Sequence, residues 1–143
     1  MRHYERSALL PYSTEQMFRI VADVPKYCEF LPWCSASRLL AQNGSDLVGE
    51  LELSVSGIRQ TFRTQNSLLP HRNIRMSLVD GPFSHLQGEW DFQQLGSEGC
   101  RVSMSLEFEF SNRLVEKTFG RVFSAAADKL VASFSQRADE IYG

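Results

Sequence analysis

Residues 21–34 of the chain read Val21-Ala-Asp-Val-Pro-Lys-Tyr-Cys-Glu-Phe-Leu-Pro-Trp-Cys34. The stretch places large apolar side chains between two prolines, in a segment too broken to form a long helix. Pro25 favours the first turn of a short helix, because its missing N–H group would have no partner there in any case. Pro32 disfavours helical geometry at Leu31 and directs the chain into an extended run. The segment Pro25–Trp33 therefore needs something to fold against, either as a plug at the end of an ordinary core or as the cover of a binding groove.

Size and composition predict one globular domain. The chain has 143 residues, of which 43% are apolar and 22% charged, and this suits a single substantial core. Residues 1–6 carry charges where a signal peptide would need an apolar run. No apolar run approaches the roughly 18 residues of a membrane span. We therefore expect a cytoplasmic protein. Cys28, Cys34 and Cys100 are odd in number and lack Cys-x-x-Cys spacing, which favours reduced thiols over a disulfide framework or a zinc site.

Local signals predict one strand, one short helix and then a long β meander. Residues 2–9 read as the first strand, and Ser13 with Gln16 forms a capping box for a helix that should run to Ala22. After residue 33 the hydrophobic period changes from 3.6 to 2 and stays there for about 75 residues. Turn-forming residues divide this region into antiparallel strands, at Asn43-Gly44, Ser56-Gly57, Pro70-His71, Gly81-Pro82 and Gly96–Gly99.

Alternation assigns one face of these strands to the interior. The apolar positions stay in phase, whereas the intervening positions are mostly Glu, Gln, Ser, Arg and Asp. The inward set is Leu47, Gly49, Leu51, Leu53 and Val55, then Leu86, Gly88, Trp90 and Phe92, then Val102, Met104, Leu106, Phe108 and Phe110. The cover must be residues 113–142, where apolar side chains recur at helical spacing. The sequence therefore predicts an α+β fold in which an antiparallel sheet of about seven strands packs against one long C-terminal helix.

A long helix across a strongly curved sheet favours an internal cavity, although a filled core is an equally good interpretation of the same residues. Gly120 lies inside the predicted helix, where glycine costs about 1 kcal/mol relative to alanine. It either lets a strand or ligand approach the helix backbone or marks a kink. The residues expected to line an apolar groove are Phe30, Leu31, Trp33, Phe62, Met76, Leu78, Phe83, Trp90, Met104, Phe108, Phe119, Gly120 and Phe123.

Four motifs carry a resemblance to a known family. The stretch 21–34 is joined by Ser77-Leu-Val-Asp-Gly-Pro-Phe83, Gly88-Glu-Trp90 and Phe119-Gly-Arg-Val-Phe123. Together they resemble the coenzyme Q-binding branch of the START and polyketide-cyclase-like superfamily, and within it the bacterial ribosome association toxins. Many members have proline where this chain has Cys28, which loosens the start of that loop without removing a chemical group.

The resemblance implies a helix-grip fold and two activities. One is the binding of ubiquinone in support of respiration, with transient membrane contact as a further implied interaction. The other is binding to the large ribosomal subunit, which blocks its joining to the small one. Neither activity requires a cofactor, although ubiquinone would be a bound ligand.

The sequence contains no recognisable catalytic or metal-binding set. His3, His71 and His85 are scattered without ligand spacing, and neither a nucleophile elbow nor a phosphate-binding glycine loop occurs. Asp23, Glu29 and Cys34 would be candidates for acid–base or nucleophilic work if they were buried in the groove, as in a polyketide cyclase or aromatase. We expect none of them to lie there, and therefore a protein that is not an enzyme.

Charge is unevenly distributed along the chain. The formal net charge is −2, yet residues 54–79 contain Arg59, Arg63, Arg72 and Arg75 and no acidic residue. Arg59 and Arg63 alternate with Ile58, Gln60 and Phe62, so they should lie on the solvent face of their strand, where they are candidate contacts for ribosomal RNA phosphates. A solvated strand that carries arginines is the alternative, since four charges form a modest electrostatic footprint.

Overall fold

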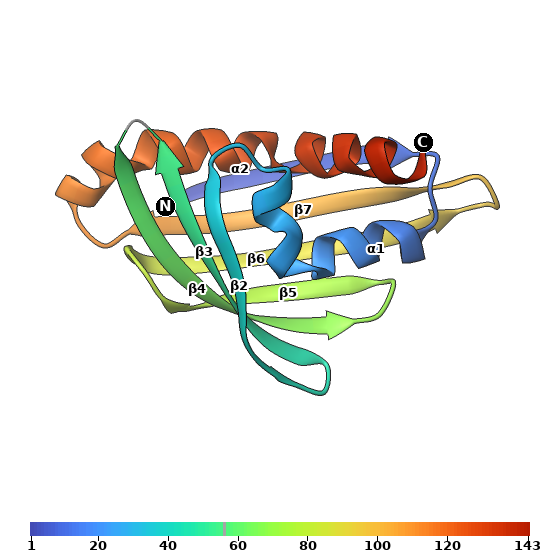
Figure 1. Cartoon of the computed structure of the whole chain (residues 1–143), viewed down its shortest axis with the longest axis horizontal. Helices are drawn as coiled ribbons and strands as arrows, with labels where there is room; N and C mark the ends of the chain where they lie inside the picture. The colour runs from blue at the N-terminus through green and yellow to red at the C-terminus, as the bar shows by residue number, and fades with distance from the viewer. Residues whose placement is uncertain (56) are drawn as a thin grey trace.

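The structure is a computed structural model that describes residues 1–55 and 57–143, and of Val55 only the backbone is described. The elements follow the chain as β1 (Arg2–Leu10), α1 (Thr14–Ala22), the 3-10 helix η1 (Val24–Glu29), β2 (Cys34–Asn43), β3 (Asp46–Val55), β4 (Ile58–Leu69), β5 (Asn73–Asp80), β6 (Phe83–Leu95), β7 (Gly99–Phe110) and α2 (Arg113–Tyr142). Figure 1 shows α2 lying along the sheet, with α1 and η1 on the same side. The predicted α+β fold with one long C-terminal helix is confirmed.

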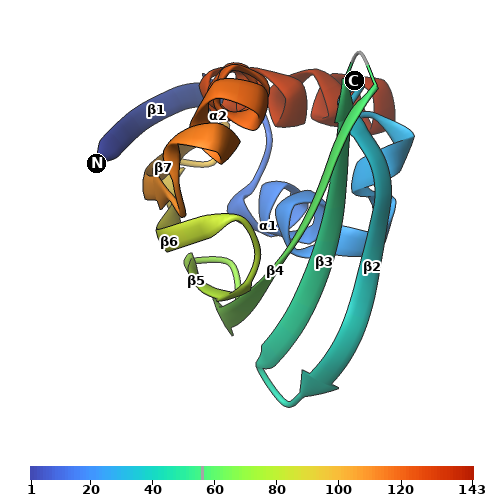
Figure 2. The same ribbon diagram turned by 90° about the vertical axis from the view of Figure 1, so that its left-hand side faces the viewer.

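The described strands form one antiparallel sheet in the order β1-β7-β6-β5-β4-β3-β2. Consecutive strands from β2 to β7 are neighbours, which is the expected meander, and β1 pairs with β7 at the far edge. Figure 2 shows how strongly the sheet curls, with α2 across its open side. The curl brings strands that are distant in the sheet to face the same helix.

The turns lie close to their predicted positions. In the first hairpin Asn43 pairs with Asp46, so the two turn residues are Gly44 and Ser45 rather than the predicted Asn43 and Gly44. Gly44 has a φ of 63°, a conformation that glycine adopts at no steric cost. In the second predicted turn, Ser56 lies outside the described residues. The three later turns connect β4 to β5, β5 to β6 and β6 to β7, as predicted.

Local sequence explains the short helices that precede the meander. The Ser13 side chain accepts a hydrogen bond from the Gln16 backbone N–H, and the Gln16 side chain accepts one from the Ser13 backbone, so the predicted capping box is present. Pro25 lies in the first turn of η1, as its missing N–H group favours. The chain then becomes extended at Cys34, directly after Trp33.

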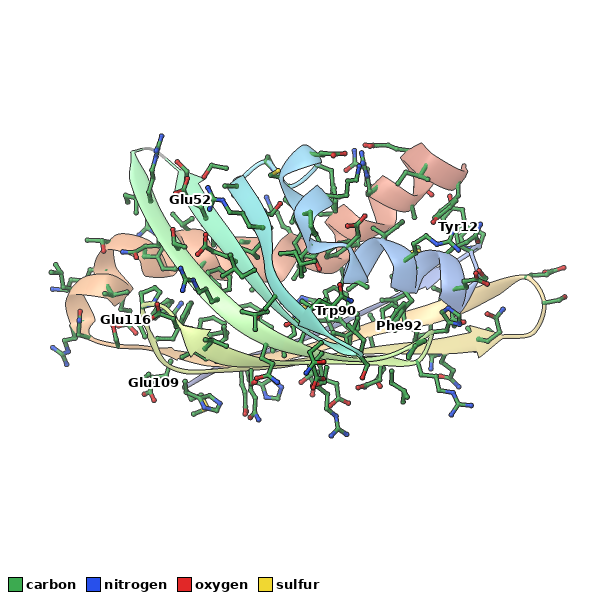
Figure 3. All side chains as sticks on the ribbon, turned by 60° about the horizontal axis from the view of Figure 1, so that its bottom comes forward. Tyr12, Glu52, Trp90, Phe92, Glu109 and Glu116 are labelled. Carbon is green, nitrogen blue, oxygen red and sulfur yellow. The ribbon has the colours of Figure 1, made fainter. Side chains whose placement is uncertain are left out.

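One face of the sheet is covered and the other is open to solvent. Figure 3 shows Trp90 and Phe92 on the helix side of the sheet and Glu109 on the other side. Trp90 and Phe92 are buried, whereas Glu109 is exposed. The strictly alternating burial of β7 confirms the inward assignment of its apolar residues.

Gly120 serves packing between α2 and β7. A Cβ atom at this position would lie 3.3 Å from Cε2 of Phe110, which is tighter than an ordinary contact. The group that approaches the helix backbone is therefore a phenylalanine ring from the sheet rather than a ligand.

Candidate ligand-binding site

An internal cavity of about 80 Å³ lies between the sheet, η1 and the middle of α2. Its wall is almost wholly apolar. We call residues 24–33, which comprise η1 and the residues up to Trp33, the cover segment. The cavity wall includes Val24, Tyr27 and Leu31 from the cover segment, and Ala126, Ala127, Leu130 and Phe134 from α2. Ligand pockets for small molecules are typically about 300–1,000 Å³. A ring-sized ligand would therefore enter only if the cover segment moved outward.

Six of the thirteen groove candidates from the sequence line this cavity. The residues that do so are Leu31, Trp33, Phe62, Met76, Trp90 and Phe123. They come from the cover segment, from three strands and from α2, so the fold brings together side chains that are far apart in the sequence.

The other seven candidates lie outside the cavity wall. They are Phe30, Leu78, Phe83, Met104, Phe108, Phe119 and Gly120. Phe83, Phe108 and Phe119 belong to an aromatic cluster around Phe123, whose ring centroid is 4.8 Å from that of Phe83 and 4.7 Å from that of Phe108. These rings fill the space beneath the first third of α2. The candidate list therefore reaches further towards the start of α2 than the cavity does, because aromatic residues are densest there.

Two polar wall residues, Thr64 and Asn66, did not appear among the sequence candidates. Both lie on β4 in phase with Phe62, and the Thr64 hydroxyl donates a 2.9 Å hydrogen bond to Oδ1 of Asn66. The signal that would have found them is the alternation itself, which places every second residue from Phe62 on the inner face whatever its polarity.

The cover segment is held to α2 by one arginine. Nη2 of Arg137 lies 2.9 Å from Oε1 of Glu29, and its guanidinium carbon lies 5.0 Å from the centroid of the Phe30 ring. The Phe30 ring also packs edge-on against Phe134, with 5.4 Å between centroids. These contacts join η1 to α2 at the surface of the protein, beside the residues that line the cavity.

The three candidate catalytic residues are not assembled in the cavity. Asp23 and Glu29 are exposed, and Glu29 pairs with Arg137 and Lys26. Cys34 is buried beside the carbonyl of Ala36, and burial raises the pKa of its thiol to about 11. Such a thiol stays protonated at neutral pH and is a poor nucleophile. Within the described part of the chain, no group of three or more His, Cys, Asp or Glu residues is arranged so that it could hold a metal ion.

The four arginines proposed to contact RNA are exposed, including Arg59 and Arg63, which were expected on the solvent face of their strand, but two of the four are partly neutralised. Arg63 lies 2.7 Å from Glu50, which also pairs with Arg38, and Arg75 lies 3.4 Å from Glu89. Arg59 and Arg72 have no ion-pair partner among the residues that the structure describes. The acidic partners come from neighbouring strands, so the sequence segment alone overstated the positive charge of this surface.

A seven-stranded antiparallel sheet curled around one long helix, with an apolar cavity between them, defines the helix-grip class of START-like domains. None of the helices in the described residues is long and apolar enough to cross a bilayer. The chain belongs to the family described as polyketide cyclase / dehydrase and lipid transport, whose sequence profile matches residues 10–135.

Relatives within this family confirm the branch indicated by the sequence motifs. The chain is 46% identical over 143 residues to the ribosome association toxin RatA of Vibrio cholerae, a match that covers 100% of this chain and 99% of that protein. It is 32% identical over 145 residues to the mitochondrial coenzyme Q-binding protein COQ10 homolog B of Xenopus laevis, with 98% of this chain and 59% of that protein covered.

A solved structure supports the fold independently of close sequence similarity. The Zhui aromatase/cyclase of Streptomyces sp. R1128 matches with a TM-score of 0.80 over 96% of this chain and 93% of that one, at 19% identity. A likeness at this low identity shows the shared helix-grip fold alone.

Proposed function

We propose that the protein is a non-enzymatic binding protein whose cavity holds ubiquinone or a similar prenyl lipid. The observation that carries the proposal is the apolar cavity between the sheet, α2 and a cover segment that is fastened at the surface. An apolar wall suits the ring and the prenyl tail, and the coenzyme Q-binding relative supports this ligand class. A prenyl lipid resides in membranes, so transient membrane contact belongs to the proposal.

A polyketide cyclase or aromatase activity is the less favoured function. An acid–base mechanism would need a titratable group in the cavity beside a second polar group. The titratable residue in the wall is Tyr27, but its hydroxyl donates to the Val21 carbonyl and burial raises the pKa of the phenol well above its ordinary value. The polar wall residues Thr64 and Asn66 do not titrate in the range used for such catalysis.

Filling the cavity tests the ligand proposal. Ala127 lines the cavity, so replacing it with leucine should occupy part of the space that the ligand needs, while Ala125→Leu on the exposed side of α2 serves as the matched control. A solubilised short-chain ubiquinone should quench the fluorescence of Trp33 and Trp90 saturably in the wild type and in Ala125→Leu. Ala127→Leu should show at least tenfold weaker quenching. Equal quenching in all three proteins would place the ligand elsewhere.

A second function is favoured by the full-length similarity to a ribosome association toxin. We propose that the protein also binds the large ribosomal subunit in the cytoplasm and blocks subunit joining, acting through its surface rather than its cavity. The arginines of β4, of β5 and of the turn between them are the proposed contacts for RNA phosphates. Arg59 at the start of β4 and Arg72 in the β4–β5 turn should contribute most, because no carboxylate neutralises them among the described residues.

Paired and unpaired arginines provide a matched test of that surface. Arg59→Gln with Arg72→Gln should weaken binding to isolated large subunits and reduce its salt dependence by roughly one phosphate contact per residue. Arg63→Gln with Arg75→Gln removes the same charge and should have a smaller effect. Sucrose gradients at two salt concentrations would measure both. Equal binding by the first variant and the wild type would exclude this surface as the contact.

A further inference from the structure

Asn66 and Trp90 bring side-chain hydrogen-bond donors to the mostly apolar wall of the cavity. Asn66 is only 5% exposed and Trp90 only 2%, and both side chains line the cavity wall. They come from β4 and β6, which lie on the two sides of β5 in the sheet. Placing a carboxamide in an apolar wall is unfavourable unless its polar atoms find partners, so its presence there needs an explanation.

The Asn66 carboxamide is only half satisfied by the protein. Its Oδ1 accepts the hydrogen bond from the Thr64 hydroxyl, which fixes the side chain against β4. Its Nδ2, with two N–H groups, donates to no acceptor among the described residues, and neither does the indole N–H of Trp90.

These unpartnered donors border open space. Among the described residues, every side-chain nitrogen or oxygen that is sealed from solvent-sized probes has a hydrogen-bond partner. Nδ2 of Asn66 and Nε1 of Trp90 have none, so neither atom is sealed, and the cavity is the space that both side chains line. The cavity therefore presents donors without acceptors of their own, and its natural occupant is a molecule that carries acceptors on an apolar body.

We propose that Nδ2 of Asn66 donates a hydrogen bond to a carbonyl oxygen of the bound ligand and thereby selects a quinone ring over a plain hydrocarbon, with the Trp90 indole as a second donor. Thr64 is a positioning residue, because its bond to Oδ1 fixes the amide and leaves Nδ2 to donate to the ligand. This inference rests on the proposed quinone-binding function and names the group that recognises the ring.

Water is the alternative partner for the donors of Asn66 and Trp90. A cavity of about 80 Å³ holds roughly two molecules at the liquid volume of about 30 Å³ each, and the two donors with Thr64 would anchor one. Water would satisfy the same donors but would give no preference among lipids that share a tail.

The test compares two ligands and three proteins. The ligands are a short-chain ubiquinone and a benzene ring that carries the same prenyl tail but no oxygen. The proteins are the wild type, Asn66→Leu, which keeps the approximate side-chain volume and removes the donor, and Thr64→Val, which removes only the positioning bond. Calorimetric titration measures both affinities, after urea unfolding has confirmed that each variant is folded. Asn66→Ala replaces Asn66→Leu if the latter does not fold.

We expect the wild type to prefer the quinone and Asn66→Leu to bind it about tenfold more weakly, the effect of about 1.4 kcal/mol from one lost hydrogen bond. Affinity for the oxygen-free ring should be unchanged, and Thr64→Val should show an intermediate loss for the quinone. The infrared carbonyl band of the bound quinone should shift to lower wavenumber in the wild type and shift back in Asn66→Leu.

Each contrary outcome has a distinct meaning. Equal quinone affinity in the wild type and Asn66→Leu, or a wild type without preference between the ligands, overturns the role of Asn66 and leaves quinone binding in place. No binding of either ligand by the wild type overturns the quinone-binding function and this inference together.

Discussion

Tyr27 anchors the cover segment from within. Its hydroxyl donates a hydrogen bond to the carbonyl of Val21 at the end of α1, and its ring packs edge-on against Phe134, with 5.2 Å between centroids. Burial raises the pKa of this phenol well above its ordinary value, so it stays protonated and remains a donor. One side chain thereby ties η1 to α1 and to α2.

Removing this hydroxyl should destabilise the fold without changing its shape. Tyr27→Phe leaves the Val21 carbonyl without its partner, and we expect the free energy of unfolding to fall by about 1–2 kcal/mol. Tyr4→Phe is the matched control, because the Tyr4 ring stacks on Phe108 while its hydroxyl makes no hydrogen bond within the described residues. Urea unfolding of both variants measures the difference. Equal losses in the two variants would refute the anchoring role.

Glu50 gives the protein a specific dependence on pH. Hydrogen bonds from Arg63 and Arg38 hold the pKa of this carboxyl below its ordinary value of 4.5. The folded state therefore favours the carboxylate, and the resulting stabilisation is complete above the pKa of the unfolded chain and lost as the pH falls through the folded pKa.

Glu50→Gln should remove that dependence. The difference in unfolding free energy between the wild type and this variant should be constant near neutral pH and shrink steadily below about pH 4.5 as Glu50 becomes protonated in the wild type. Denaturant unfolding across this range measures it. A difference that stays constant into the acid range would show that the two arginines do not act on Glu50 as charges.

At the scale of elements, the cover segment is the part of the fold best placed to move. It consists of η1 and the residues up to Trp33, and Arg137 fastens it to α2 through Glu29 and the Phe30 ring. These are partly exposed contacts, each worth about 0.5–1 kcal/mol. The cavity below is smaller than typical ligand pockets, so the proposed binding of a quinone ring would require this segment to move.

Arg137→Ala should loosen the cover segment alone. We expect amide hydrogen exchange in residues 24–33 to accelerate about fivefold, which corresponds to about 1 kcal/mol, whereas exchange in β7 should not change. Arg19→Ala removes a comparable ion pair from α1 and should leave residues 24–33 unaffected. Unchanged exchange in the Arg137 variant would mean that burial of Tyr27 and Leu31 alone holds the segment closed.

The elements were more predictable from sequence than the site. Local sequence determines the helix cap at Ser13, the turns that contain glycine and the alternating burial of β7, so these features can be predicted from neighbouring residues. The position of the cavity depends on where α2 crosses the sheet. That crossing is set by the aromatic cluster around Phe123, which fills one end and leaves space further along the helix.

Polar residues were the other source of error, for a physical reason. Thr64 and Asn66 occupy inward positions of β4, but a search for an apolar groove passes over them. Arg63 and Arg75 looked free because their acidic partners, Glu50 and Glu89, come from adjacent strands. The first error comes from selecting inward residues by polarity, and the second comes from pairing across the sheet, which a single strand does not reveal.

At the scale of the whole molecule, the fold separates two surfaces with different uses. The inner face of the sheet borders the cavity with α2, whereas Arg59 and Arg63 lie on the outer face of β4 and Arg72 lies in the turn that follows, so the proposed lipid and ribosomal contacts would use different surfaces. Substitutions on one side should therefore leave the other activity intact. One relative is named a ribosome association toxin and another a coenzyme Q-binding protein, which is consistent with one fold serving both functions.

The central claim is that the cavity carries a prenyl lipid in the cell. The most direct measurement is purification of the protein from its own organism under native conditions, followed by mass spectrometry of an organic extract, with the Ala127→Leu variant prepared in parallel. We predict roughly one prenylated quinone or related prenyl lipid per wild-type chain and a much lower amount in the variant. Extracts of the two proteins that contain the same background of lipids, with no prenyl lipid enriched in the wild type, would contradict the claim.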